Sequence, residues 1–283
     1  MRLLSAFPLT FVLVLFWAAI LLASCADGAP LRASATSLRS ATPAAASVRK
    51  TASFAHSAAP SAAAPSSSTL PGRSLRVLSF NVREWTRDRD ETGEYYWRRR
   101  MEAMTRMIVD VNPDVICLQE VLPPVARYVP DGYRRVGVGV SHPIFVRDTM
   151  QTSKHSFAIF WEACTVEGIR VINVHSRWER EIVERTVRQV NGQLTGHDLA
   201  CGDWNTGLRS IEAAGLQMQS ARTMLAVPET DTFANFTKSE SHGAIDHFFV
   251  NGLTPLSYRM VTDGYGVPRI SDHWPIVLDL LLP

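Results

Sequence analysis

Short apolar runs that each end near a polar side chain recur along residues 74–283, and this pattern predicts buried strands. The predicted strands cover residues 75–82, 114–121, 142–147, 156–164, 168–176, 198–205, 243–250, 256–263 and 275–282. The runs 142–147 and 156–164 alternate apolar and polar positions, and we expect them to pair with each other.

Three other segments carry apolar residues at helical spacing, namely 95–111, 178–194 and the short segment 210–218. The first has a stripe that we expect to pack into the core, formed by Trp97, Met101, Met104 and Ile108. The basic run WRRR (97–100) follows several acidic residues, and we expect it to form a solvated helix face.

Groups of strands separated by few helices predict two packed sheets with helices outside, a layered α/β sandwich. The chain has 283 residues, of which 46% are hydrophobic and 20% are charged. This is an ordinary globular composition, and the length allows one large domain or two small ones.

The segment 1–25 is typical of a secretory signal peptide, because Arg2 precedes a charge-free apolar run from Leu9 to Ala23. The stretch LLASC resembles the bacterial lipobox, in which cleavage before the cysteine exposes it to lipidation. It predicts that Cys25 carries a lipid anchor to the membrane. Ordinary cleavage nearby and an uncleaved anchor are the alternatives, since the apolar run is long for a signal.

Residues 26–73 are rich in Ala, Ser and Pro and predict a disordered linker, because such a segment buries too little apolar surface to offset its chain entropy. We therefore expect an exported protein, either a membrane-anchored lipoprotein or a secreted one. A basic, Ser-rich and acid-poor stretch is also compatible with an organelle transit segment behind a signal.

Charge is spread unevenly along the chain. Residues 1–73 hold six of the 29 Lys and Arg residues and one of the 27 acidic residues. The folded part, 74–283, therefore has 23 basic and 26 acidic residues and a net charge of −3. Tight nonspecific binding of nucleic acid depends on many Lys and Arg contacts to phosphates, and this composition does not favour it.

Three cysteines fall in the folded part, and we expect all of them to be buried free thiols. Side chains alternate along a strand. Counted in this way, Cys117 points opposite to Glu120, while Cys201 shares a face with Asp203. The thiols of Cys117 and Cys201 should therefore lie on different sides of their sheets.

Polar and ionisable residues gather at the ends of six predicted strands: Asn81, Glu120, His175, Asp203 with Asn205, Asp246, and Asp272 with His273. Each alone is explained by a turn or a hydrogen-bonded core group. Glu120 is harder to dismiss, because alternation places it on one face with the apolar Ile116 and Leu118. Carboxylate and amide oxygens suit a hard divalent cation, and imidazoles suit acid–base work.

The motifs LSFNV, ICLQEV, INVH, CGDWNTG, IDHFFV and SDHWPI resemble, in this order, those of the endonuclease/exonuclease/phosphatase superfamily. The resemblance covers essentially all of residues 74–283, which we take as the catalytic domain. It implies a four-layer α/β/β/α sandwich of the DNase I-like type, with two mixed sheets packed face to face and the site at one edge. It also implies that Glu120 ligates Mg²⁺ or Mn²⁺, with Asn81 and Asp272 as further residues of the metal site.

The same resemblance implies the roles of the remaining residues. His175 and Asn205 would hold the scissile phosphate, and Asp203 would orient or deprotonate the attacking water. His273, paired with Asp246, would stabilise the transition state or transfer a proton, since a carboxylate behind an imidazole fixes its tautomer and favours its charged form.

We therefore expect a phosphoester hydrolase that uses metal-assisted in-line attack of water. A small phosphomonoester or phosphodiester substrate is preferred because the domain is acidic and compact. A secreted endonuclease acting on nucleic acid is one alternative, and an exported binding protein that keeps the fold without catalysis is another. No protein partner is inferred from the sequence.

Overall fold

The computed structural model of the protein describes residues 73–139, 141–234, 236 and 243–283. The predicted signal segment with Cys25 and, apart from Arg73, the predicted linker lie outside these residues. Within the part of the chain that is described, no helix has the length and apolar character needed to cross a membrane.

Twelve strands form two six-stranded sheets. The first sheet has the order β11-β12-β1-β2-β4-β3, with β11 (Thr254–Met260), β12 (Ile276–Leu281), β1 (Ser74–Asn81), β2 (Val115–Gln119), β4 (Ile144–Arg147) and β3 (Tyr133–Val136). The second has the order β5-β6-β7-β8-β10-β9, with β5 (Thr152–Ala158), β6 (Trp161–Val166), β7 (Ile169–His175), β8 (Asp198–Asp203), β10 (Asp246–Asn251) and β9 (Gln219–Ser220).

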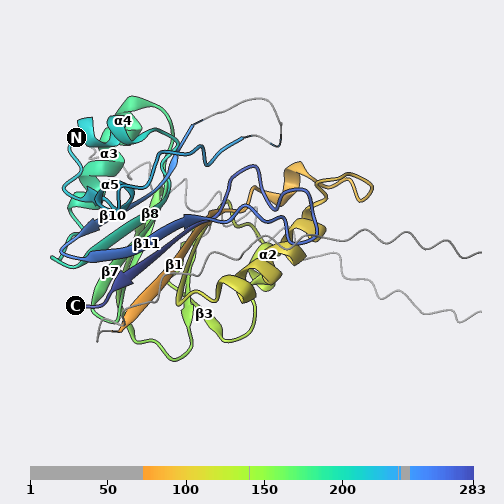
Figure 1. The fold of residues 1–283 in the computed structure, drawn as a ribbon, viewed down its shortest axis with the longest axis horizontal. Helices are drawn as coiled ribbons and strands as arrows, with labels where there is room; N and C mark the ends of the chain where they lie inside the picture. Colours follow the sequence, from red (N-terminus) through yellow and green to blue (C-terminus); the bar gives the residue numbers. More distant parts are fainter. Residues whose placement is uncertain (1–72, 140, 235, 237–242) are drawn as a thin grey trace, which may run out of the picture. The chain divides into compact units, whose positions relative to one another are not determined.

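Helices cover the outer faces of both sheets (Figure 1). The helices are α2 (Trp97–Val111), α3 (Arg180–Asn191), α4 (Leu208–Ala213) and α5 (Ala221–Met224), with 3₁₀ turns η1 (Trp85–Arg87) and η2 (Val125–Tyr128). The apolar stripe of α2 packs on the first sheet, α3 and α4 pack on the second, and a third apolar cluster lies between the sheets. This arrangement confirms the predicted four-layer α/β/β/α sandwich and the buried role of the α2 stripe.

Two parallel strand pairs set the position of the polar strand ends. β1 pairs with β2 across the α2 crossover, and β7 pairs with β8 across the α3 crossover, while the other pairings are antiparallel. Parallel neighbours end at the same edge of a sheet. Asn81, Glu120, His175 and Asp203 therefore come to one edge of the sandwich.

The expected pairing of 142–147 with 156–164 is wrong. β4 lies in the first sheet beside β2, and the run 156–164 is divided between β5 and β6 of the second sheet. Alternation shows that one face of each run is buried, but it carries no information about the partner strand. The edge strand β3 was not predicted, and β5 was predicted only at residues 156–158, because both strands are rich in polar residues that are not buried.

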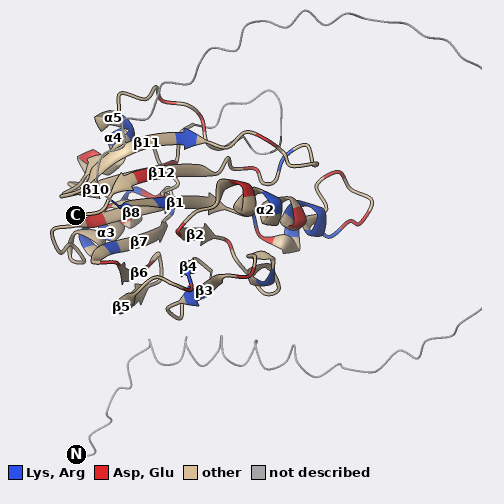
Figure 2. Ribbon diagram, turned by 60° about the horizontal axis from the view of Figure 1, so that its bottom comes forward, with Lys and Arg blue, Asp and Glu red and all other residues tan. Residues whose placement is uncertain are grey.

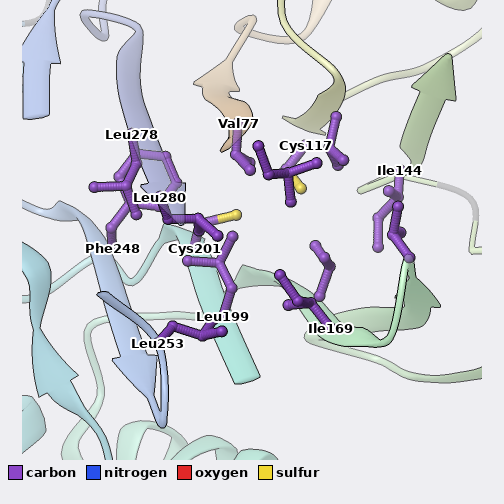
Figure 3. Packing of buried hydrophobic residues seen from close by; sticks show 14 of the residues in the cluster. Val77, Cys117, Ile144, Ile169, Leu199, Cys201, Phe248, Leu253, Leu278 and Leu280 are labelled. Atoms are coloured by element: carbon purple, nitrogen blue, oxygen red, sulfur yellow. The ribbon is translucent and has the colours of Figure 1, made fainter. Parts of the chain in front are cut away.

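All three cysteines are free and buried, as predicted, but the thiols of Cys117 and Cys201 do not lie on different sides. Both belong to the apolar cluster between the sheets (Figure 3). Cys164 belongs to the same cluster. Counting back from Glu120 fails because this residue has a left-handed backbone, with φ of 58°, and its side chain no longer follows the alternation of β2.

The run WRRR forms a solvated helix face only in part. Basic and acidic residues occur together on α2 (Figure 2), and Arg98 and Arg99 are exposed. Arg100 is 0% exposed and donates to Asp88 Oδ2 at 2.7 Å and to the carbonyl oxygen atoms of Val82 and Ile270. The correction follows from helical spacing, since position 100 lies on the same face as the buried stripe.

Replacing Arg100 by Ala should destabilise the domain by about 3–5 kcal/mol, because the carbonyl groups of Tyr95, Val82 and Ile270 lose their donor and the largely buried Asp88 carboxylate keeps only Arg83. Arg99→Ala, on the exposed face of the same turn, should change the free energy of unfolding by less than about 0.5 kcal/mol. Denaturant unfolding of the two variants measures the difference. Equal losses would show that Arg100 does not anchor α2.

Candidate active site

Asp203, the last residue of β8, lies at the centre of the converging strand ends. Its Oδ2 accepts hydrogen bonds from the side-chain amides of Asn81 at 3.0 Å and Asn205 at 3.2 Å, and its Oδ1 accepts the backbone N–H of Asn205 at 2.8 Å. The Nε2 atoms of His175 and His273 each lie 3.8 Å from Oδ2. One carboxylate thus contacts groups from both sheets.

The sequence around Asp203 allows this approach of the strands. Gly202 has a φ of +135°, and a Cβ there would lie 1.9 Å from the carbonyl oxygen of Val174 on β7. Only glycine permits β8 to run this close to β7. Asn205 is left-handed with φ of 52°, a conformation that Asn tolerates better than most residues, and this turns its amide back onto Asp203.

His273 and Asp246 form the hydrogen-bonded pair that the sequence predicted. Nδ1 of His273 lies 2.9 Å from Asp246 Oδ2, and both residues are almost fully buried. Asp246 begins β10 directly opposite Asp203, and its backbone N–H donates to the hydroxyl of buried Thr232. The backbone N–H of Trp274, the residue after His273, donates to the Thr232 carbonyl at 2.7 Å. Thr232 therefore supports the backbone at both members of the pair.

The charges of the site follow from burial and from these contacts. Burial alone would lower the pKa of His273, but the carboxylates of Asp246 and Asp203 outweigh it and raise the pKa to about 10. Burial raises the pKa of Asp203 to about 7, assisted by the negative charge of Asp246 and opposed by His273. Burial lowers the pKa of His175, so this ring is neutral at neutral pH.

Glu120 reaches the site through its backbone and not through strand alternation. Ile116 and Leu118 face α2, whereas the left-handed backbone of Glu120 turns its side chain toward the edge of the sandwich. The expectation that Glu120 shares their face is therefore wrong. Its Oε1 accepts from the Asn81 amide at 3.2 Å, and its Oε2 accepts the backbone N–H of Glu84 at 2.8 Å.

Asp272 joins the site through an arginine that the sequence reasoning missed. Arg83 Nη1 donates to Asp272 Oδ2 at 2.6 Å, and the backbone N–H of Arg83 donates to Asn81 Oδ1 at 2.9 Å. Burial would raise the pKa of Asp272, but the positive charges of His273 and Arg83 lower it. The Asp272 carboxylate is therefore ionised, with part of its charge compensated by Arg83.

The groups of this site differ in how well they fit a divalent cation. In the part of the chain that is described, single ligand atoms of Asp203, Asp246 and His273 lie within 4.8 Å of one another. Nδ1 of His273 forms a hydrogen bond with Asp246. Because the pKa of the ring is raised, both ring nitrogen atoms carry a proton and neither has a lone pair for a metal. Glu120 is partly exposed and each of its oxygen atoms accepts only one of these bonds, so its carboxylate fits a hard cation better.

Comparison with known proteins identifies the family. The profile described as Endonuclease/Exonuclease/phosphatase family matches residues 78–273, from within β1 to the predicted catalytic histidine. The chain belongs to this family. Its members are phosphoester hydrolases that use divalent metals, which agrees with the predicted enzyme class. No curated protein matches the chain.

Solved structures share the family's fold at low sequence identity. An endonuclease/exonuclease/phosphatase from Bacteroides vulgatus is 18% identical with a TM-score of 0.63, covering 75% of this chain and 100% of its own. A mannosyl-6-phosphatase from Bacteroides thetaiotaomicron is 19% identical with a TM-score of 0.61, covering 74% and 100%. TDP2 from D. rerio, complexed with a single-strand DNA product, is 17% identical with a TM-score of 0.59, covering 74% and 99%.

The eight site residues expected from the family resemblance form one connected network. Arg83, Arg100 and Thr232 also support this network, and none of them belongs to the motifs recognised in the sequence. Arg83 lies two residues after Asn81, and its left-handed φ of 57° was not visible in the sequence. Arg100 carried a signal, since it interrupts a buried helical stripe, and it bonds the same Asp88 as Arg83. Thr232 had no signal, because its role depends on a tertiary contact with the first residue of β10, 14 residues further along the chain.

The His273–Asp246 pair generates a kinetic prediction. His273→Ala should lower turnover of a chromogenic phosphodiester by roughly 10²–10⁴, the span of a positioned acid–base group. Asp246→Asn should cost less, because the imidazole remains. The double variant should be about as slow as His273→Ala alone, since the two residues act as one unit. Additive losses in variants with unchanged thermal melts would show that they work independently.

The pH profile of the same variants tests the charge of the ring. Activity that needs protonated His273 should be kept below its raised pKa of about 10 and lost as the pH rises through it. Asp246→Asn removes the strongest attraction that raises this pKa, so the alkaline limb of kcat/KM should move to lower pH. An unmoved limb would contradict the assignment.

Proposed function

We propose that this member of the endonuclease/exonuclease/phosphatase family is an exported, divalent-metal-dependent phosphoesterase that hydrolyses a small phosphomonoester or phosphodiester. The observation that carries the proposal is the buried Asp203 carboxylate beside neutral His175 and charged His273, with Glu120 at 4.0 Å from His175. A non-catalytic binding protein has no need for a buried carboxylate and a buried imidazolium held so close together.

Each side chain has a distinct part in the proposed reaction. Asp203, with a pKa of about 7, accepts the proton of the attacking water. His175 and Asn205 donate N–H groups to the scissile phosphate. The charged His273 ring, held by Asp246, stabilises the negative charge that builds up in the transition state. Glu120 would hold Mg²⁺ or Mn²⁺, with Asn81 and Asp272 beside it, and the bound ion would neutralise phosphate charge and assist the leaving oxygen.

A small substrate is favoured over nucleic acid by charge. The folded part has a net charge of −3, and basic and acidic residues are both scattered over its elements (Figure 2). Nonspecific nucleic-acid binding relies on neutralising several phosphates. The phosphatase among the structural neighbours is compatible with this choice, whereas TDP2 with bound DNA keeps a nuclease or DNA-processing activity as the second candidate.

Metal dependence and substrate class can be tested together on the full-length protein. Excess chelator should abolish hydrolysis, and Mg²⁺ or Mn²⁺ should restore it. Glu120→Gln should weaken Mn²⁺ binding, measured by calorimetry, by roughly 10- to 100-fold, while Glu212→Gln on the exposed side of α4 should not. Full activity in excess chelator would reject this mechanism.

The substrate panel should contain sugar phosphates, inositol phosphates, sphingomyelin, a chromogenic phosphodiester, RNA and plasmid DNA. Higher kcat/KM for a small ester supports the proposal. A preference for plasmid DNA or RNA would replace it with the nuclease, and no hydrolysis of any member would favour a binding protein.

Export with lipidation at Cys25 is supported by the LLASC stretch and by the apolar run before it. Mass spectrometry of the mature N-terminus should find a lipidated Cys25 as the first residue. An unmodified terminus at another position would favour ordinary secretion or organelle import, and an intact Met1 would reject cleavage. None of these outcomes bears on the enzyme assignment.

A further inference from the structure

Arg269 lies beside the active site with part of its guanidinium group unpaired. It stands three residues before Asp272, and its Cζ lies 4.0 Å from the centroid of the Trp274 ring. Its Nε and Nη2 atoms are buried, and neither has a hydrogen-bond partner among the described residues. Native proteins pair almost all such donors, so an unpaired pair next to a catalytic centre is a candidate ligand contact.

The two unpaired nitrogen atoms form one edge of the guanidinium fork. Nε–H and the neighbouring Nη2–H point in the same direction, and this edge matches two oxygen atoms of a phosphate. The guanidinium carbon lies over the Trp274 ring, 4.0 Å from its centroid, and this cation–π contact favours one position of the group. The edge is therefore held ready for a bidentate anion.

Among the described residues, no carboxylate forms a hydrogen bond with Arg269. Arg83 bonds both Asp88 and Asp272, and Arg100 bonds Asp88, so these two carboxylates already face two guanidinium groups. Arg269 adds a third. Asp272 attracts it electrostatically, but no hydrogen bond joins the two side chains.

Incomplete pairing alone does not mark a site. Arg222 also has buried Nε and Nη1 atoms without partners, but its Nη2 donates to the Tyr258 hydroxyl at 3.0 Å. It belongs to α5, which packs on β10 and β11, and its hydrogen bond and its cation–π contact are both with Tyr258 of β11. Arg269 differs because it lies three residues before Asp272 and four residues before His273.

We propose that Arg269 forms an anion subsite that binds a phosphate group of the substrate other than the one being hydrolysed. The scissile phosphate is assigned to His175 and Asn205 on the second sheet, whereas Arg269 approaches from the segment before β12 of the first sheet. The preferred substrate then carries two phosphate groups, as in a sugar bisphosphate or in neighbouring positions of a nucleic-acid strand. This proposal rests on the proposed phosphoesterase function.

Matched substrate pairs test the subsite on the full-length protein. One pair is glucose 6-phosphate and glucose 1,6-bisphosphate. The other is the p-nitrophenyl ester of thymidine 5′-phosphate with and without a 3′-phosphate. Arg269→Ala should lower kcat/KM for the doubly phosphorylated member of the accepted pair by about 10- to 100-fold, the effect of a lost hydrogen bond to a charged group. The loss should appear as a higher KM with kcat unchanged, since the remote phosphate is bound equally well in the ground state and in the transition state.

The singly phosphorylated member should lose less than about threefold in kcat/KM, because it makes no contact with the subsite. Arg269→Lys should recover part of the affinity, since it restores the charge without the fork. Arg98→Ala is the matched control, because Arg98 also stacks on a tryptophan, with Cζ 5.4 Å from the Trp97 ring, but lies on exposed α2 surface. If Arg269→Ala does not fold, Arg269→Gln takes its place.

Calorimetry in chelator gives a second readout that needs no turnover. The wild-type protein and Arg98→Ala should bind glucose 1,6-bisphosphate, or the thymidine bisphosphate, more tightly than the monophosphate, and Arg269→Ala should lose this preference. Equal effects on both members of a pair, or no effect on either, would overturn the subsite. If no substrate is hydrolysed, the proposed function fails, and the binding preference alone still decides for or against the subsite.

Discussion

Burial of the Asp203 carboxylate is the constraint on which the site depends. The residue is 1% exposed, and an ionised carboxylate in such a place is stable only when N–H donors and positive charge surround it. Asn81 supplies a donor from the first sheet, Asn205 supplies two from the turn after β8, and His273 supplies the charge. These contacts join both sheets at the edge where chemistry takes place. Burial raises the pKa of Asp203 and these contacts lower it, and the resulting value of about 7 suits a general base near neutral pH.

A chain of arginine–carboxylate contacts extends this constraint into the scaffold. Buried Arg100 on α2 holds Asp88, Asp88 holds Arg83, and Arg83 holds Asp272 beside the catalytic histidine. Each contact compensates a charge that would otherwise be costly to bury. The helix outside the first sheet is thereby connected to the segment that precedes β12. Arg269 stands at the end of this series of contacts, and no carboxylate of the described residues forms a hydrogen bond with it, so an anionic substrate group suits its position.

The polar core between the sheets shows how the two halves of the sandwich are kept in register. Gln119, the last residue of β2, donates to Asn173 Oδ1 on β7 at 2.7 Å, and the Asn173 amide donates to the carbonyl groups of Leu118, His142 and Pro143. Both side chains are fully buried. Because buried amides lose stability when unpaired, this cross-sheet contact favours one alignment of the sheets and so the meeting of Asn81 with Asp203.

The sequence by itself determined most strands, the two long helices, the sandwich class and the residues of the candidate site, because apolar periodicity and polar strand ends are local properties. It also contained the signal for Arg100, which stands on a buried helical face. Only the tertiary structure decided that 142–147 and 156–164 belong to different sheets, that Glu120 leaves the alternation of its strand, and that Arg83 and Thr232 support the site. Strand partners, left-handed turns and contacts between distant segments depend on how the whole chain packs, and no local period records them.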